Sequence, residues 1–225
     1  NVTYCHRGFS FESALLDALM FFEDDKVSDI LIGGIDECTD DFVQIYGYLN
    51  YWKPPVNNSD LVNSNTSGTI AGEGSVFFML SDRPKGNQNT LISDVHTFIT
   101  ADCASIHEIE SEIDTFLQRN QLNINDIDIA VLGINGDAFY DANYYSLMQS
   151  YFAKNTVFSV YKTLCGEYYT SSAFALWLST VILSDQKIPD VVRISSGYPA
   201  KIQNILIYNH IRNIEHSLIL LSSVK

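Results

Sequence analysis

Basic residues are scarce in this 225-residue sequence, which has 13 Lys and Arg against 27 Asp and Glu and a formal net charge of −14. Binding to nucleic acid or to an anionic membrane surface needs a basic face, so we expect neither kind of partner. Long hydrophobic runs are also missing. The longest, residues 173–183, is too short to span a bilayer. Because no basic segment precedes an apolar stretch, we expect no signal peptide.

Cysteine is sparse and widely spaced. The four positions are Cys5, Cys38, Cys103 and Cys165. They form no C-x-x-C pair, and no histidine lies at metal-ligand spacing from them, so the sequence predicts neither a zinc site nor any other metal or bound cofactor. The pattern is typical of free, mostly buried thiols in a reducing compartment, and we therefore expect a cytoplasmic protein.

The remaining composition, 46% hydrophobic and 18% charged, is that of a globular chain with a real core. Apolar residues at helical spacing predict helices over residues 10–22, 106–120, 141–152 and 169–183, the last almost wholly apolar and therefore central. Short apolar runs predict strands over residues 75–81, 91–100, 127–134 and 157–161, a buried parallel strand over 30–34, and a closing hairpin of 205–208 with 217–221. Residues 46–74 are irregular and predict a long surface insertion. This pattern indicates an α/β fold with buried parallel strands and a central apolar helix.

Three turns carry residues capable of chemistry. Cys5 lies between a strand-like segment and a helix start, where the helix dipole and free N–H groups favour a thiolate, although a packed structural cysteine is the simpler interpretation. Asn135 follows a buried strand, in an Asn-Gly turn that positive backbone φ alone would explain. Lys162 and Glu167 flank a turn before the most apolar helix. Charged residues are rare in such a place unless they are paired or functional. The alternative interpretation is a solvated loop with a glutamate at the helix N-terminus.

Taken together, the order and spacing of these turns resemble the β-ketoacyl synthase family of condensing enzymes, which has the thiolase fold. The resemblance covers nearly the whole chain from Val2 to about Leu221. The matching segments are Cys5-His6-Arg7-Gly8, Asp29 to Glu37 with its Gly33-Gly34 pair, Ala71-Gly72-Glu73-Gly74-Ser75, Leu132-Gly133-Ile134-Asn135-Gly136 and Lys162-Thr163-x-x-Gly166-Glu167. The Gly-Glu-Gly segment is the most specific single match.

The departures from the family pattern concern the site itself. Where the family has its two histidines, this chain has Asn135 and Glu167. The glycine-rich loop that the family carries near its C-terminus should fall at residues 208–217, which contain no glycine. The chain also begins just before the nucleophile, so most of the first structural repeat is absent, and we expect either a fragment or strands supplied by another chain.

The resemblance implies a layered αβαβα thiolase-like fold with an incomplete first repeat. It divides the chain into the remainder of an N-terminal half, residues 1–100, with the insertion at about 46–74, and a C-terminal half, residues 101–225. It further implies a protein of fatty-acid or polyketide biosynthesis that handles acyl thioesters of acyl carrier protein phosphopantetheine or coenzyme A. The implied partners are acyl carrier protein and either a second copy or another β-ketoacyl synthase chain. The implied site residues are Cys5, Asn135, Lys162 and Glu167.

The implied reaction has two parts with different requirements. Acyl transfer to Cys5 needs a thiolate and an oxyanion hole. Decarboxylative condensation then needs two hydrogen-bond donors on the malonyl carbonyl. Asn135 can donate one such bond, but an ionised Glu167 can donate none. Losing one preorganised donor typically costs ~3 kcal/mol, so we expect weak or absent condensation. Protonation of Glu167 would rescue one donor, whereas pairing with Lys162 would rescue none.

Three functions follow from this chemistry. The first is a degenerate subunit resembling the chain-length factors of type II synthases, which dimerises with an active synthase and shapes an acyl tunnel; the candidate walls are Phe9, Phe11, Tyr140 and Tyr144. The second is a cysteine acyltransferase of the 3-oxoacyl synthase class that uses Cys5, with Glu167 as base and Asn135 as oxyanion donor. The third is a non-catalytic binding or scaffold module in which Cys5 is inert.

Overall fold

The structure is a computed structural model of the chain, and it describes residues 2–24, 27–84, 90–101 and 104–224. Cys103 lies outside the described residues. The α-helices are α1 (Ser10–Glu23), α2 (Asp40–Tyr48), α3 (Ile106–Arg119), α4 (Ala138–Ser150), α5 (Lys162–Cys165) and α6 (Ser171–Asp185). The strands are β1 (Asp29–Asp36), β2 (Gly74–Ser81), β3 (Thr90–Ile99), β4 (Ile129–Leu132), β5 (Val157–Val160), β6 (Asn204–Ile211) and β7 (Glu215–Ser223). Short 3₁₀ helices cover Arg7–Phe9, Asn58–Asn63 and Ile124–Asp126.

The four predicted helices are confirmed, with bounds that shift by up to three residues. The start of α3 shows the local signals that made this helix predictable from the sequence. The Ser105 side chain accepts a hydrogen bond from the backbone N–H of Glu108, and the Glu108 carboxylate accepts one from the Ser105 N–H. This reciprocal capping box satisfies two backbone donors that the first turn leaves free. The apolar stripe that follows, including Ile109, Ile113 and Phe116, is fully buried.

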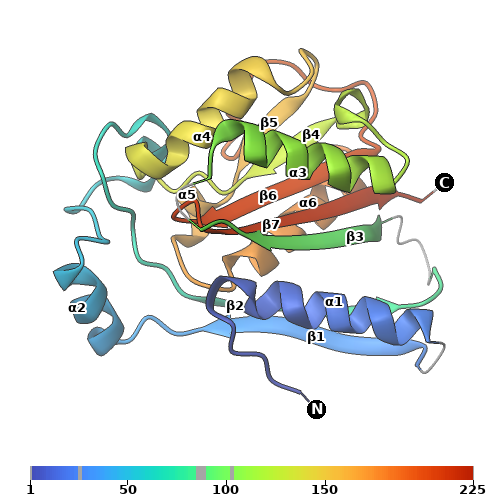
Figure 1. The fold of residues 1–225 in the computed structure, drawn as a ribbon, viewed down its shortest axis with the longest axis horizontal. Coiled ribbons are helices and arrows are strands. Elements are labelled where there is room, and N and C mark those ends of the chain that lie inside the picture. The colour runs from blue at the N-terminus through green and yellow to red at the C-terminus, as the bar shows by residue number, and fades with distance from the viewer. Residues whose placement is uncertain (1, 25–26, 85–89, 102–103, 225) are drawn as a thin grey trace.

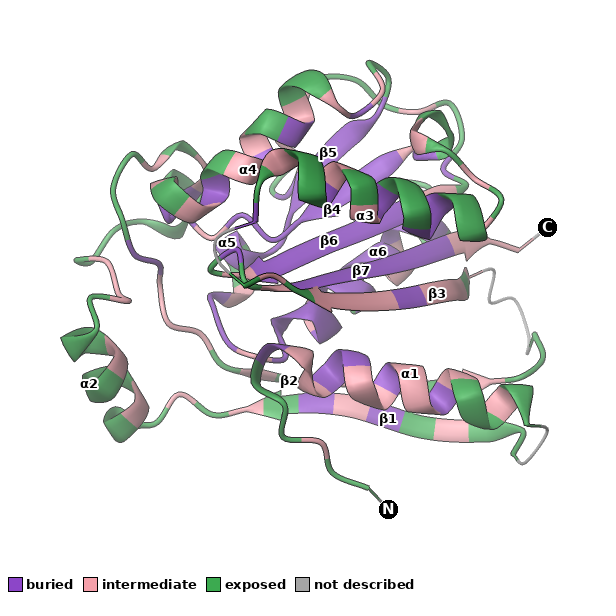
Figure 2. Ribbon diagram, in the orientation of Figure 1, coloured by how far each residue is buried: buried purple, intermediate pink, exposed green. Residues whose placement is uncertain are grey.

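A five-stranded mixed sheet forms the centre of the molecule, with the strand order β3-β7-β6-β4-β5. β4 pairs in parallel with both β5 and β6, whereas β7 runs antiparallel to β6 and to β3. The predicted closing hairpin is therefore confirmed as β6 and β7. Its turn uses Arg212 and Asn213 at positive φ, 54° each, where a glycine would be less strained. Figure 2 shows that β4, β5, β6 and β7 are buried along most of their lengths.

Each face of this sheet packs into a separate core, because successive side chains of a strand point to opposite faces. On one face, α3 and α4 cover residues such as Ala130 and Leu206. On the other, α1, α6 and the β1–β2 pair bury residues such as Val131 and Ile207. The described layers thus run α, β, α, β, which is four of the five predicted layers.

The buried parallel strand predicted over residues 30–34 does form as part of β1, but its direction and its burial were predicted wrongly. β1 pairs with β2 in an antiparallel register, Ile32 opposite Phe78, and the two strands form a separate sheet. Only one side of this pair is covered. Ile32 is 7% exposed, whereas Leu31 and Ile35 are 64% and 66% exposed. An apolar run of this length fits either a two-sided or a one-sided strand, so the sequence alone did not separate them.

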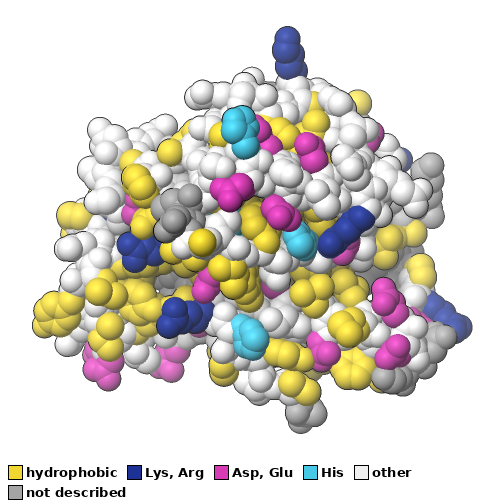
Figure 3. All heavy atoms as spheres, in the orientation of Figure 1, with side chains coloured by type: hydrophobic (Ala, Val, Ile, Leu, Met, Phe, Trp, Pro, Cys, Tyr) yellow, Lys and Arg dark blue, Asp and Glu magenta, His cyan; other side chains and the backbone are white. Residues whose placement is uncertain are grey.

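Residues 46–74 are only partly irregular. The end of α2 falls within them, as does the 3₁₀ helix Asn58–Asn63. Thr39 caps the start of α2, since its side chain accepts a hydrogen bond from the Phe42 N–H, and the helix contains no buried residue. Figure 3 shows hydrophobic side chains over the part of the surface where α2 lies in Figure 1.

The predicted division near residue 100 stays a prediction. β3 lies before this boundary, yet it pairs along its length with β7, which lies after it. No helix among the described residues combines the length and the apolar composition that crossing a bilayer would require.

Candidate functional site

Asn135 lies in the turn after β4, and each of its polar groups forms a hydrogen bond. Its N–H donates to Asp141 Oδ1 (3.2 Å), and its carbonyl accepts from the Thr69 hydroxyl (2.7 Å). Its side-chain oxygen accepts from the Asp137 N–H (3.0 Å), and its Nδ2 donates to Glu167 Oε2 (2.5 Å). The amide orientation is therefore fixed by partners on both ends.

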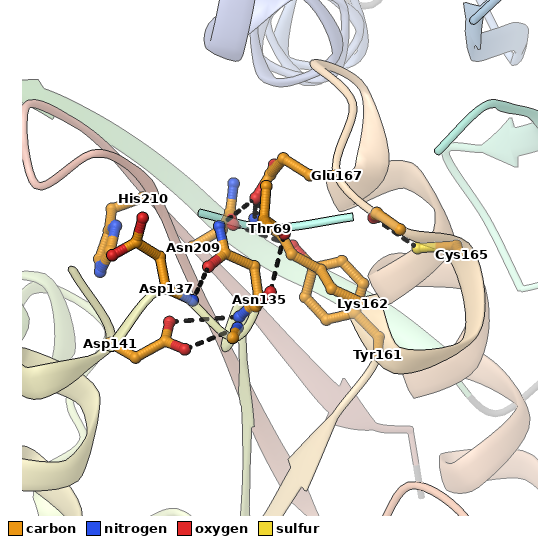
Figure 4. A network of polar contacts seen from close by, with 12 residues as sticks. Thr69, Asn135, Asp137, Asp141, Tyr161, Lys162, Cys165, Glu167, Asn209 and His210 are labelled. Carbon is orange, nitrogen blue, oxygen red and sulfur yellow. Dashed lines mark hydrogen bonds and ion pairs between the residues drawn. The ribbon is translucent and has the colours of Figure 1, made fainter. Parts of the chain in front are cut away.

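Lys162 lies two residues after the end of β5 and forms a buried ion pair with Glu167. The Lys162 Nζ lies 2.9 Å from Glu167 Oε1 and 2.8 Å from Oε2, and the two side chains are 0% and 5% exposed. The structure thus favours the second of the two alternatives for Glu167, pairing with Lys162. Because Asn135 also donates to this carboxylate, three of the four predicted site residues meet in one network (Figure 4).

The backbone around Glu167 is locked against the segment that precedes β2. The Glu167 N–H donates to the Ile70 carbonyl (2.9 Å), and its own carbonyl accepts from the Gly72 N–H (3.0 Å). Gly166 has a φ of +74°, and a Cβ at Gly72 would lie 2.0 Å from the Cys165 carbonyl oxygen. Gly72 of the Gly-Glu-Gly segment and Gly166 of the Lys-Thr-x-x-Gly segment are therefore required by this close approach.

Asp141 is a buried carboxylate beneath the Asn135 turn that the sequence analysis missed. It accepts hydrogen bonds from the backbone N–H groups of Asn135 and Gly136 (2.7 Å to the latter). Burial raises its pKa to about 7, although these hydrogen bonds and the charge of Lys162 act in the opposite direction. The only sequence signal is an acidic residue in the first turn of the following helix, which is common and unspecific.

An aromatic pocket opens next to Glu167. Its walls include Phe42, Tyr46, Tyr51, Trp52 and Tyr169, with Glu167 among the lining residues. The rings pack against one another, with centroids 4.4 Å apart for Phe42 and Tyr46 and 5.0 Å for Tyr51 and Trp52. The Tyr46 and Tyr169 hydroxyls are hydrogen-bonded, which ties the insertion to the start of α6. The insertion therefore covers the outer side of the buried network.

Cys5 lies on the surface, before the 3₁₀ helix Arg7–Phe9. Its strand-like neighbours at residues 2–4 form no strand, and α1 begins five residues later at Ser10. Among the described residues, no hydrogen bond or ion pair joins Cys5 to Asn135, Lys162 or Glu167. Its role as a site residue stays a prediction.

The Cys5 turn does reach the same side of the molecule as the network. The Gly8 N–H donates to Glu215 Oε2 (3.2 Å), and a Cβ at Gly8 would lie 2.3 Å from Ile211 Cδ1. Ile211 in turn lines the aromatic pocket together with Glu167. The hairpin turn between β6 and β7 thus connects the two regions.

The other thiol of the region is unsuited to nucleophilic attack. Burial raises the pKa of Cys165 to about 12, and its Sγ donates to the Gly166 carbonyl (3.4 Å) rather than toward the network. Within the described ranges, no group of three His, Cys, Asp or Glu side chains lies close enough together to hold a metal ion.

The candidate tunnel walls do not share one cavity. Phe11 is buried in the core that α1 and α6 form, and its ring lies 5.9 Å from that of Phe78. Tyr144 is buried in the core on the opposite face of the five-stranded sheet. Phe11 and Tyr144 cannot line the same tunnel, and that part of the prediction is wrong.

The comparisons with known proteins give matches in structure alone. No family model matches the sequence, and no curated protein matches it. A type II polyketide ketosynthase in complex with its acyl carrier protein superposes with a TM-score of 0.82 at 13% identity, over 100% of this chain and 64% of that chain. A ketosynthase with its chain length factor from Xenorhabdus doucetiae gives a TM-score of 0.78 at 16% identity, over 99% and 60%.

A β-ketoacyl synthase from Burkholderia phymatum gives a TM-score of 0.76 at 13% identity, over 96% of this chain and 60% of that one. The described chain therefore has the thiolase-like fold of ketosynthases, which confirms the predicted fold class. The chain spans 60–64% of the length of these three solved structures. At these identities the likeness establishes the fold, and the chemistry depends on the residues of the site.

Proposed function

We propose that this chain is a β-ketoacyl synthase-like protein of fatty-acid or polyketide biosynthesis that has lost decarboxylative condensation and acts, in the cytoplasm, as a chain-length-factor-like partner subunit. The observation that carries the proposal is the closure of the network around Glu167. The Asn135 amide donates to its carboxylate at 2.5 Å, and Lys162 occupies both oxygens. Both donors are therefore directed at the Glu167 carboxylate.

The energetic argument supports the loss of condensation. An enolate that forms beside the Lys162–Glu167 ion pair finds both donors already bonded to the Glu167 carboxylate. Two preorganised donors are missing, and each is typically worth ~3 kcal/mol of transition-state stabilisation. Together they correspond to roughly a ten-thousandfold loss of rate or more.

The first test is an assay of malonyl thioester decarboxylation. The purified protein is incubated with malonyl-coenzyme A and with malonyl acyl carrier protein, and release of carbon dioxide is measured against a protein-free blank. We expect release no faster than the blank, because the carbonyl donors and not Cys5 would promote this step. Protein-dependent turnover would contradict the proposed loss of condensation.

The partner role rests on fold likeness to ketosynthase and chain-length-factor complexes, and it has its own test. The protein is purified under native conditions from its source cells, and its mass is determined by light scattering. We expect a stable complex with a ketosynthase chain, identified by mass spectrometry, and binding of acyl carrier protein to that complex. A clean monomer, or a second copy of this chain as the sole partner, would contradict the heterodimer.

A second candidate function is acyl transfer through Cys5, which the exposure of this thiol favours. Cys38 provides a control within the same molecule, because burial and the charges of Glu73 and Asp40 raise its pKa. Iodoacetamide at about pH 6 separates a thiolate from an ordinary thiol. Alkylation of Cys5 faster than a free thiol would support acyl transfer; a rate no faster removes it.

A further inference from the structure

We infer that Lys162 and Asn135 form a binding site for a small carboxylate, and that the side chain of Glu167 occupies this site as an internal ligand. The two oxygens of Glu167 receive the Lys162 Nζ at 2.9 and 2.8 Å and the Asn135 Nδ2 at 2.5 Å. An ammonium and an amide N–H that both donate to one carboxylate form strong, charge-assisted hydrogen bonds of the kind that bind anions. The inference does not depend on the proposed function.

The Asn135 donor is positioned by contacts other than Glu167, and the Lys162 side chain is enclosed by burial. The Asn135 amide is oriented by the Asp137 N–H on its oxygen, and its backbone is held by Asp141 and Thr69. Lys162 is 1% exposed and lies in a short helix directly after β5. The site should therefore persist when the Glu167 carboxylate is removed.

The main chain at Glu167 is also fixed independently of its side chain. Both its N–H and its carbonyl are bonded to the segment that contains Ile70 and Gly72. Truncation at Cβ in Glu167→Ala therefore removes a CH₂–COO⁻ group and leaves the walls of the cavity in place. The lost group has the size, shape and charge of acetate, which differs from it by one hydrogen.

The charge balance favours an anion in that cavity. Without Glu167 the Lys162 ammonium stays buried, and leaving such a charge unpaired is strongly unfavourable. Asp141 also interacts with Lys162, but burial raises its pKa to about 7, so it is a poor source of the missing charge near neutral pH. Because Glu167 is among the residues that line the aromatic pocket, the vacated site would border that pocket.

The experiment measures thermal unfolding of the full chain in increasing sodium acetate, with matched sodium chloride to correct for ionic strength. We expect Glu167→Ala to unfold several degrees below the wild type in chloride. Acetate should raise its unfolding temperature in a saturating manner, because a ligand of the native state stabilises that state. The wild type should show no such response, since its site is occupied.

Three controls define the site. Glu167→Gln fills the same cavity and should not respond to acetate. The double variant Glu167→Ala with Lys162→Met has the cavity but no ammonium, and it should not respond either. Benzoate is too large for a cavity of this size, so it should not replace acetate for Glu167→Ala.

Each remaining outcome decides the inference. If Glu167→Ala shows no acetate-specific stabilisation, or if the double variant responds equally, then Lys162 and Asn135 are not a carboxylate site. If Glu167→Ala does not fold in chloride, it is refolded from urea in acetate. Recovery of the native near-ultraviolet circular dichroism in acetate alone supports the site, and failure in both salts overturns it. None of these results depends on condensation or on a partner subunit.

Discussion

Asp141 should give this protein a stability that falls as the pH rises toward neutrality. Its carboxyl is 2% exposed, and burial raises its pKa from 3.8 to about 7. The unfolded chain releases this proton near the ordinary value, whereas the folded chain holds it. The contribution is therefore fully present below about pH 4 and is lost as the pH rises through about 7.

The size of the effect follows from the shift. A difference of about 3 pKa units corresponds to ~4 kcal/mol between the two limits, as an order of magnitude. Replacing Asp141 with asparagine removes the titration but leaves only one acceptor for two backbone donors, at Asn135 and Gly136. That loss should cost about 1–3 kcal/mol at every pH.

Urea unfolding of the wild type and of Asp141→Asn, from about pH 4.5 to about pH 8, measures the prediction. Across this range the stability of the wild type relative to the variant should fall by ~3 kcal/mol, so that near pH 8 the variant is as stable as the wild type or more stable. Asp41→Asn on the exposed surface of α2 controls for loss of one negative charge. A stability difference between wild type and Asp141→Asn that does not change with pH would refute the reasoning.

Three further predictions concern packing and a buried histidine. Gly72→Ala should cost about 3 kcal/mol or more in urea unfolding, because its Cβ would lie 2.0 Å from the Cys165 carbonyl oxygen. Gly47→Ala in α2, where the nearest atom is 3.8 Å away, should instead gain ~0.5–1 kcal/mol, and equal effects of the two changes would contradict the close approach. Phe116→Ala should cost about 3–5 kcal/mol by the same measurement, since this ring is 0% exposed. Burial lowers the pKa of His216 from 6.5 to about 4, so its contribution to folding stability is present above about pH 6.5 and is lost as the pH falls toward 4. Relative to His216→Phe, the wild type should lose at most ~3 kcal/mol of stability on acidification. A stability difference between the two proteins that does not change with pH would contradict this.

The helices were predictable because their signals are local. In α3, the Ser105 and Glu108 capping pair and the apolar stripe that follows act within one helix, and no distant partner can change them. β1 was different. Its alternation places Ile32 inward and Leu31 outward, which is visible only once β2 is known to be its antiparallel partner. Direction in a sheet is a property of two strands, so one run of residues cannot specify it.

The site was predictable in its members but not in their bonding. β4 and β5 are adjacent and parallel, with Leu132 opposite Val160, so the turns that follow them emerge at the same edge. That topology brings Asn135 and Lys162 together, and order along the chain was enough to suggest it. Whether Glu167 would be protonated or paired depended on distances of a few tenths of an ångström. Asp141 gave only the unspecific signal of an acidic residue in the first turn of a helix, because its importance comes from burial.

The fold and the buried network differ in how far they tolerate substitution. At 13% identity the chain still superposes with a TM-score of 0.82, because a hydrophobic pattern of the right volume is sufficient to specify the layers. The buried Lys162–Glu167 ion pair tolerates substitution less well. Replacing Glu167 by histidine would restore a donor at that position but would leave Lys162 beside Asp141, whose raised pKa makes it an inadequate counter-ion at neutral pH. A single substitution is therefore opposed by the cost of a buried unpaired charge, and regaining two free donors requires coordinated changes at Asn135, Glu167 and the groups around Lys162.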